Sequence, residues 1–234
     1  MKIIIFGPQG SGKGTQAELI ARRYHWPYIS TGDIFRYHLK NQTELGKQVN
    51  QYIQEGHLVP DELTNEIIKD RIHQPDCEVG FVLDGYPRNK NQFNFLDQLT
   101  KIDLAVVIDL SDQAAVKRLS GRLACKCGLS YHLDFNPPKK PGICDRCSSE
   151  LFQRDDDQPE AIKKRLEIYH HQTEPIFSAY EKQGILSKVD GAKSIEEVYQ
   201  QIEKIIRRRW IPKFWFLTFD FWIILWLPSK NLKK

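Results

Sequence analysis

The sequence carries little net charge, few cysteines and no long apolar run near its first residue. Lys and Arg number 34 and Asp and Glu number 30, so the formal net charge is only +4. Residues 210–234 contribute three of these charges, because four lysines oppose one aspartate there. The rest of the chain is almost neutral and shows no concentrated basic face, which argues against a nucleic-acid partner.

Cysteine is also scarce, because five residues in a chain of 234 are too few for a fold built on disulfides. Four of them lie between positions 125 and 147, a pattern typical of a metal site in a reducing compartment. The apolar run at residues 2–6 is too short for a signal peptide and leads directly into glycines. We therefore expect a cytoplasmic location.

The composition, 41% hydrophobic and 27% charged, is that of an ordinary globular protein. It excludes a disordered chain, a collagen and a polytopic membrane protein. Short apolar segments alternate with amphipathic ones, which predicts a parallel α/β sheet. The expected strands are residues 2–6, 81–83, 104–110 and 185–189.

Helices are predicted after these strands. One is expected close behind the first strand, one near 112–122 and one from about Ile195, where Ser194 and Glu197 form a capping box. Residues 30–60 are mostly helical in pattern, with Gly46 and Gly56 as breaks. Residues 122–157 are rich in Cys, Pro and Gly, with a strand expected at 131–135. Both stretches are interpreted as inserts on the core.

The segment Gly7–Thr15 has the pattern G-x-x-x-x-G-K-G-T, a Walker A motif with glycine in place of the usual Ser or Thr. Its glycines allow backbone N–H groups to turn toward phosphate oxygens at the positive end of a helix. Lys13 is long enough to reach the β- and γ-phosphates, and Thr15 supplies a hydroxyl. An incidental glycine-rich turn is disfavoured, because strand, loop, lysine and helix all agree.

Three further motifs identify a family. Tyr28–Asp33 has the sequence YISTGD, Phe81–Arg88 has FVLDGYPR with Gln92 after it, and Leu123–Asp157 forms a long Cys-rich segment. Together with the phosphate loop they resemble the adenylate kinases of the bacterial long-lid type. The resemblance runs from Met1 to about Arg208.

The resemblance implies a P-loop nucleoside monophosphate kinase fold, an α/β fold with a parallel five-stranded sheet flanked by helices. It implies the reaction ATP + AMP ⇌ 2 ADP with Mg²⁺, in a monomer whose two inserts close over the substrates. The implied divisions are a core at 1–29, 60–121 and 158–209, a monophosphate-binding insert at 30–59, a lid at 122–157 and an extension at 210–234.

The resemblance also implies roles for individual residues. Phosphoryl transfer needs alignment and charge neutralisation rather than a base, which explains the many arginines. The implied catalytic residues are Lys13, Arg88, Arg122, Arg154 and Arg165. The implied ATP-binding residues are Gly10, Ser11, Gly12, Lys13, Gly14, Thr15, Arg118, Arg122, Ser130, Tyr131 and Lys193. The implied AMP-binding residues are Thr31, Arg36, His57, Leu58, Val59, Gly85, Arg88, Gln92, Arg154 and Arg165.

Two sites for cations are expected. Asp84 and Asp33 resemble carboxylates that hold Mg²⁺ through water, although Asp33 is nearly as well explained as a helix cap. Cys125, Cys127, Cys144 and Cys147 favour a structural Zn²⁺ over free thiols or a disulfide. Their first pair is C-x-C, where zinc-bearing members of the family have C-x-x-C.

Other interpretations stay open at this stage. A kinase for UMP or CMP is disfavoured by the long lid and by Gln92. A second alternative is a membrane-recruited nucleotide-binding module that acts through residues 210–234. These residues are dense in Trp, Phe, Ile and Leu, but Asp220 lies near their middle, so a peripheral contact is favoured over a membrane span. An extension without a function of its own is slightly preferred to either.

Overall fold

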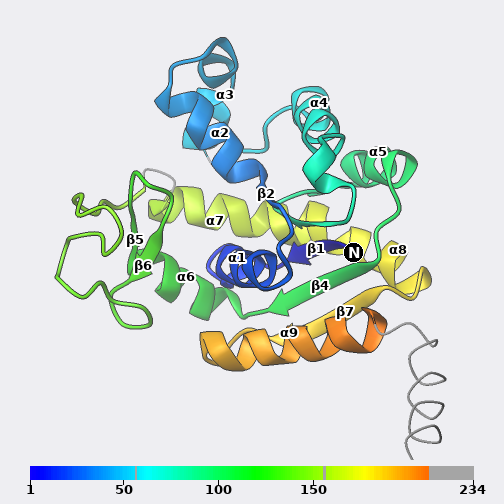
Figure 1. Cartoon of the computed structure of the whole chain (residues 1–234). Helices are drawn as coiled ribbons and strands as arrows, with labels where there is room; N and C mark the ends of the chain where they lie inside the picture. The colour runs from blue at the N-terminus through cyan, green and yellow to red at the C-terminus, as the bar shows by residue number, and fades with distance from the viewer. Residues whose placement is uncertain (56, 155–156, 211–234) are drawn as a thin grey trace, which may run out of the picture.

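A five-stranded parallel sheet forms the centre of the computed structural model, which describes residues 1–234 except 56, 155–156 and 211–234. The strand order is β2-β3-β1-β4-β7 (Figure 1). The strands are β1 (Lys2–Phe6), β2 (Tyr28–Ser30), β3 (Phe81–Asp84), β4 (Leu104–Asp109) and β7 (Leu186–Asp190). Because all five are parallel, their carboxyl ends share one edge, where ligands bind in open α/β sheets.

Successive side chains of β1 point to opposite faces of the sheet, and the core is therefore divided into two layers. Ile3 and Ile5 pack on one face with Ala17, Ile20 and the apolar side of the last helix. Ile4 and Phe6 pack on the other face, among aromatic side chains such as Tyr86 and Tyr180. Both faces are covered, which is why this strand is an uninterrupted apolar run.

The helices of the core surround this sheet. They are α1 (Lys13–Tyr24), α4 (Asp61–Ile72), α5 (Lys90–Leu99), α6 (Asp112–Ser120), α7 (Pro159–Ile168), α8 (Phe177–Lys182) and α9 (Ile195–Trp210). Shorter turns are the 3-10 segments η1 (Pro75–Cys77) and η4 (Glu174–Ile176) and the π-helical segment η3 (Tyr169–Thr173). The side chains of α1 and α9 cover one face of the sheet, while those of α5, η3, η4 and α8 cover the other.

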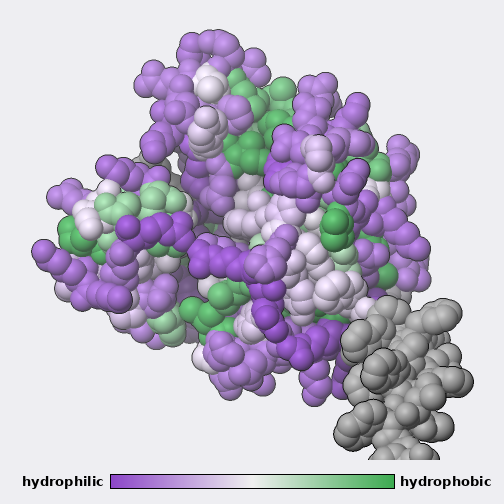
Figure 2. All heavy atoms as spheres, viewed as in Figure 1, coloured by the Kyte–Doolittle hydropathy of each residue, from purple (hydrophilic) through white to green (hydrophobic). Residues whose placement is uncertain are grey.

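Two segments project from the core and have small cores of their own. The first contains α2 (Thr31–Lys40) and α3 (Glu44–Gln54), with Phe35, Val49 and Val59 buried together. Figure 2 shows hydrophobic residues gathered between these helices and α4 on a face that is otherwise largely hydrophilic. The second contains the antiparallel pair β5 (Arg122–Ala124) and β6 (Ser130–His132), packed around the cysteines.

Most expected elements are confirmed. The four expected strands are β1, β3, β4 and β7, within a residue or two at each end. The capping box at α9 is formed, because Ser194 N donates to Glu197 Oε2 at 3.0 Å and Glu197 N donates to Ser194 Oγ at 3.3 Å. The helices behind β1 and β4 are also present.

Three local predictions need correction, and one strand lacks a prediction. Gly46 does not break a helix but lies inside α3, where its missing side chain admits the His38 carbonyl: an added Cβ would be 2.2 Å from that oxygen. The helix expected at 112–122 ends at Ser120, with Gly121 as its C-cap. The strand expected at 131–135 is shorter, because β6 ends at His132 and a turn follows. The edge strand β2 was not located from the sequence.

Two predictions fall on residues outside the described part of the chain. One is the helix break at Gly56. The other is the membrane contact of residues 210–234, of which only Trp210 lies in the described part. Among the described residues, no helix combines the length and the apolar character that crossing a bilayer requires.

Candidate active site

The glycine-rich loop joins the end of β1 to the start of α1. Gly10 and Gly12 have φ values of 85° and 88°, a left-handed conformation that glycine adopts without strain. Helix α1 has no side-chain cap at its N-terminus, so its first N–H groups can bind an anion. The buried Ser11 Oγ has no hydrogen-bond partner among the described residues. Buried polar atoms are normally paired, so this loop is suited to an anionic ligand.

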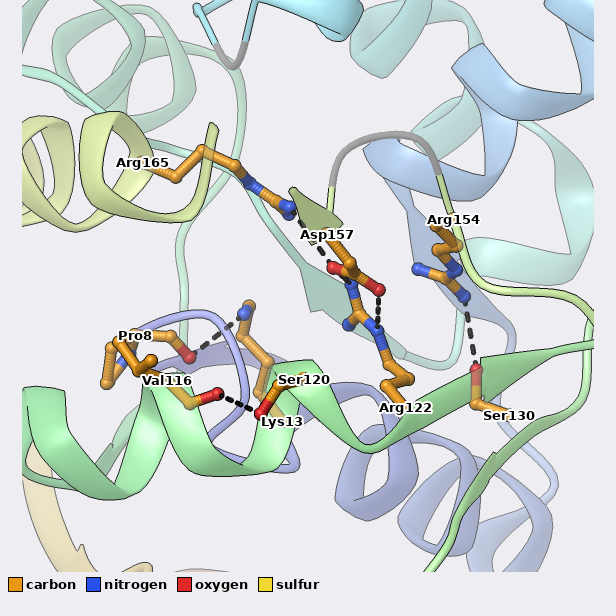
Figure 3. Close-up of polar contacts among 9 residues, drawn as sticks. All are labelled: Pro8, Lys13, Val116, Ser120, Arg122, Ser130, Arg154, Asp157 and Arg165. Carbon is orange, nitrogen blue, oxygen red and sulfur yellow. Dashed lines mark hydrogen bonds and ion pairs between the residues drawn. The ribbon is translucent and has the colours of Figure 1, made fainter. Parts of the chain in front are cut away.

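The half-buried Lys13 and the buried Asp84 carry opposite charges and lie close enough for each to shift the pKa of the other. Burial lowers the pKa of Lys13 to about 8, the nearby arginines lower it further, and Asp84 opposes the shift. Burial likewise raises the pKa of Asp84, against the pull of Lys13 and Arg88. Lys13 Nζ donates to the Pro8 carbonyl at 3.3 Å (Figure 3). The lysine is therefore held at the phosphate loop and poised to gain a stronger partner.

Asp84 ends β3 and carries one engaged and one orphaned oxygen. Tyr28 Oη donates to its Oδ2 at 3.2 Å, and Oδ1 is buried without a hydrogen-bond partner among the described residues. A buried carboxylate oxygen of this kind fits Mg²⁺ held through its waters. Asp33 is different: its Oδ1 accepts from Arg36 Nη2 at 2.6 Å. It does not cap α2, because Ser30 Oγ accepts the N–H of Asp33 at 3.2 Å.

A cavity opens between the α2–α3 segment and the core. Its lining includes most of the residues expected to bind the acceptor: Thr31, Arg36, His57, Leu58, Val59, Gly85, Arg88, Gln92 and Arg165. A second cavity, lined by Gln9 and Lys13 among others, shares Leu58, Gly85, Arg88 and Arg165 with the first. The two cavities therefore adjoin, and two arginines face both.

Gly85 is required at the meeting point of these cavities. Its φ is 80°, and an added Cβ would lie 2.8 Å from Thr31 Oγ1 and 3.1 Å from Arg88 Nη2. Its carbonyl accepts from Thr31 Oγ1 at 2.9 Å and from Arg88 Nε at 2.8 Å. One glycine thus positions both the threonine and the arginine of the first cavity.

Three arginines lie in or next to the lid segment: Arg122 in β5, Arg154 in the loop that follows β6, and Arg165 in α7. Arg122 and Arg165 point toward Asp157 from opposite sides, as Figure 3 shows. Arg122 Nε donates to Asp157 Oδ2 at 2.8 Å, and Arg165 Nη1 lies 3.8 Å from Oδ1. The Asp157 side chain is fully buried. Arg154 Nη2 donates to Ser130 Oγ at 3.1 Å within the lid segment. Asp157 is therefore the carboxylate that holds Arg122 and Arg165 together.

The remaining expected ATP contacts lie at the margin of this site. Arg118 stacks on the Phe135 ring, with its guanidinium carbon 5.2 Å from the ring centroid. Lys193 is exposed in the loop between β7 and α9. The Tyr131 side chain is buried inside the lid segment, where its hydroxyl accepts from Asp145 N at 2.8 Å. Any contact of Tyr131 with ATP would therefore use its backbone.

The four lid cysteines converge. Their sulfur atoms all lie within 4.8 Å of one another; Cys125 Sγ is 3.3 Å from Cys147 Sγ, and Cys127 Sγ is 3.6 Å from Cys144 Sγ. Four ligands at about 2.3 Å from a tetrahedral zinc would be about 3.8 Å apart, whereas disulfide sulfurs lie about 2.0 Å apart. The donor set fits zinc, and all five cysteines are unbridged.

The shortened C-x-C knuckle closes with a shorter turn. Gly128 N donates to Cys125 O at 2.9 Å, whereas Ser148 N donates to Cys144 O across one residue more, also at 2.9 Å. In both knuckles the residue after the second cysteine has a positive φ, 93° at Gly128 and 56° at Ser148. The first knuckle thus has one residue fewer in its turn, and its two cysteine sulfurs still lie close to those of the second knuckle.

Sequence reasoning missed the residues that hold the expected ones in place. Tyr28 contacts Asp84, Thr173 Oγ1 donates to Arg88 O at 2.8 Å, and Asp61 accepts from Gln92 Nε2 at 2.7 Å. These partners are 56, 85 and 31 residues apart in the chain. No local pattern marks such pairs, because the fold alone brings them together.

Comparison with known proteins gives a consistent result. A family described as adenylate kinase matches residues 5–185. A curated adenylate kinase from Agathobacter rectalis is 52% identical over 212 residues, covering 88% of this chain and 99% of that protein. One from Methanothrix thermoacetophila is 48% identical over 213 residues, covering 89% of this chain and 99% of that protein.

The lowered pKa of the half-buried Lys13 predicts proton uptake when a polyphosphate binds. Because its pKa is lowered to about 8, about half of Lys13 is neutral at pH 8. Phosphate oxygens favour the charged form and raise this pKa toward its usual value, so binding takes up about half a proton at pH 8 and little at pH 6.5. Calorimetry of ATP binding in buffers of different ionisation enthalpy measures this number.

Two variants control the proton measurement. Lys13→Met should abolish the uptake at pH 8, whereas Lys101→Met removes an exposed lysine and should leave it unchanged. Equal uptake in the unchanged protein and in Lys13→Met would show that another group titrates.

Proposed function

The chain belongs to the adenylate kinase family and transfers the terminal phosphoryl group of ATP to AMP, and from that premise we propose which of its residues do this work. The observation that carries the assignment is the pair of adjoining cavities that share Arg88 and Arg165, one of them reaching the phosphate loop. A donor and an acceptor can meet there with their phosphates between two guanidinium groups.

ATP is proposed to place its phosphates on the loop at Gly10–Thr15. Backbone N–H groups and the N-terminus of α1 would hold the β-phosphate, with Lys13 along the path to the γ-phosphate. Arg118, Ser130, Tyr131 and Lys193 would contact the rest of the nucleotide. Asp84 would hold magnesium through water, with Asp33 nearby. Magnesium bound with ATP would neutralise phosphate charge.

AMP is proposed to occupy the cavity beneath α2 and α3. Arg36 and Arg88 would bind its phosphate, because a planar guanidinium matches two phosphate oxygens at once. Thr31, Gln92 and the backbone at residues 57–59 and Gly85 would surround its base. The kinase for UMP or CMP is not favoured, since three curated relatives that are 48–52% identical to this chain are named adenylate kinases.

The transfer step is proposed to depend on charge neutralisation and exclusion of water. Arg88, Arg122, Arg154 and Arg165 would surround the moving group together with Lys13, and no side chain needs to act as a base. The inserts at 30–59 and 122–157 would close on the core at 1–29, 60–121 and 158–209 to remove water. We propose that the enzyme acts as a monomer, because one chain supplies all of these groups. The cytoplasmic location stays a prediction of the sequence.

The lid is proposed to contain a structural zinc. The lid's own core is small, comprising Cys125, Tyr131 and Cys144 with a few half-buried neighbours. A core of this size stabilises a segment poorly, and four thiolates on one ion would replace the missing apolar contacts. All four positions are protein ligands, so the ion would have no open site for substrate.

Residues 210–234 are proposed to make a peripheral contact with anionic membranes. The match to the relative from Agathobacter rectalis covers 99% of that protein but only 88% of this chain. The unmatched part of this chain is about as long as residues 210–234. Trp210 is 52% exposed at the end of α9, directly after three arginines, and packs edge-on against Tyr24 and Trp26. Tryptophan and phenylalanine between basic flanks favour the interface of a bilayer.

The acceptor assignment predicts the outcome of a coupled assay with Mg-ATP and AMP, CMP, UMP or GMP. AMP should be phosphorylated far faster than the others. Lys13→Ala should lower turnover by about a hundredfold or more, because it removes one preorganised charge from the transferring phosphates. Lys101→Ala, an exposed change, is the control. Preference for a pyrimidine acceptor would refute the assignment of the cavity around Thr31 and Gln92.

The lid assignment predicts one zinc per chain by elemental analysis. Cys144→Ser should lose the metal and lower the temperature at which the lid unfolds, because the four-ligand site is broken. Cys77→Ser, which changes the buried cysteine outside the cluster, should retain the metal. A purified chain with no zinc and an unchanged lid in Cys144→Ser would exclude a structural ion.

The extension predicts flotation with lipid vesicles. The full chain should float with vesicles that contain anionic lipid and much less with neutral ones, because three lysines follow the aromatic segment. Replacing Trp215, Trp222 and Trp226 together by serine should abolish flotation and leave phosphoryl transfer unchanged. If the full chain stays at the bottom of the gradient both with and without vesicles, the contact is ruled out.

A further inference from the structure

The side chain of Gln92 is held at both ends by groups of opposite hydrogen-bonding character. It is 2% exposed and lines the acceptor cavity. Its Nε2 donates to Asp61 Oδ1 at 2.7 Å, and its Oε1 accepts from Arg88 N at 2.8 Å. Gln92 lines the ligand cavity, and its amide is held by the Asp61 carboxylate at the start of α4 and by the backbone N–H of Arg88.

These partners permit only one orientation of the amide. A carboxylate accepts hydrogen bonds and a backbone N–H donates them. Rotating the Gln92 amide by half a turn would bring its oxygen against Asp61 and its NH₂ against the Arg88 N–H. Both hydrogen bonds would become repulsive contacts in a buried place, where unmade hydrogen bonds are costly. The positions of oxygen and nitrogen are therefore determined by the protein.

Asp61 is itself anchored by a second amide. Asn89 Nδ2 donates to the same Oδ1 at 2.9 Å, and Asn89 Oδ1 accepts from Gln92 N at 2.9 Å as the N-cap of α5. Asp61 is the first residue of α4, so this network joins the starts of two helices. The carboxylate therefore determines the orientation of both amides in the network.

Part of the bonding capacity of Gln92 remains for a ligand. An amide nitrogen has two hydrogens and an amide oxygen two lone pairs, so one N–H and one lone pair are left. Adenine presents an amino donor next to a ring acceptor, which matches this pair. Hypoxanthine and guanine present a carbonyl acceptor in place of the amino group, and their N1–H donates. The fixed amide therefore suits the first base and opposes the others.

We propose that Asp61 is a positioning residue that sets the base specificity of the acceptor cavity. It holds the Gln92 amide with its donor and acceptor in the order that adenine requires. This inference rests on the proposed role of Gln92 as the residue that reads the base. Asp61 acts through Gln92 and needs no contact with the nucleotide.

The test compares kcat/KM for AMP with kcat/KM for inosine monophosphate, the nearest nucleotide with the inverted base edge. Asp61→Ala and Asp61→Ser both remove the acceptor from Gln92, and serine is well tolerated at a helix start. Each should lower the preference for AMP by about tenfold or more, mainly through a higher KM for AMP. Asp61→Asn retains an oxygen acceptor and should retain most of the preference. Glu62→Gln, an exposed change on the same turn, should have no effect.

Further variants separate this inference from the role of Gln92. Gln92→Leu should abolish the preference, and adding Asp61→Ser to it should cause no additional loss. An unchanged preference in Gln92→Leu would refute the role of Gln92 in reading the base. A lost preference in Gln92→Leu with an intact one in Asp61→Ala and Asp61→Ser would overturn the role of Asp61 alone. A merely structural role would lower kcat/KM for both nucleotides equally, which also overturns the proposal.

Discussion

Positive charge gathered in a partly buried place is the constraint around which this enzyme is built. Three arginines lie close enough to Lys13 to lower its pKa: Arg88, Arg122 and Arg165. Such cations repel one another, and each loses hydration on burial. Two carboxylates oppose this: Asp84 beneath the phosphate loop and Asp157 between two arginines. Substrate phosphates would supply the remaining negative charge. The excess positive charge of the site without substrate therefore favours binding of a polyphosphate.

The sheet solves the positional part of this problem. β1 and β3 are neighbours in parallel register, with Ile5 opposite Asp84, so the phosphate loop and the Asp84 carboxylate emerge side by side. The α2–α3 segment and the lid segment instead have small cores of their own, separate from the core of the sheet. A segment whose contacts are mostly internal can change its position without disrupting the sheet. The loop is therefore placed by the core of the sheet, whereas the closure that we propose for the inserts would move two segments that have separate cores.

Local patterns in the sequence predicted much of this arrangement. The apolar run at 2–6, the Walker A spacing and the Ser194–Glu197 capping box each depend on neighbours a few residues apart, and each is present. The errors also have local causes. Gly46 was interpreted as a break because glycine lowers helix propensity, yet the approach of the His38 carbonyl requires it. The three-residue β2 is too short to show a periodicity.

What the sequence could not supply is the set of residues that orient the expected ones. Gln92 can be recognised from its motif, but its amide has two orientations, and only one presents the order of donor and acceptor that the proposed reading of adenine requires. The choice is made by Asp61, which is 31 residues away, and by a backbone N–H that has no sequence signature. Tyr28 on Asp84 and Thr173 on Arg88 act at similar or greater separations. Motifs therefore identify the chemical groups of this site, whereas the polarity and direction of those groups depend on long-range contacts.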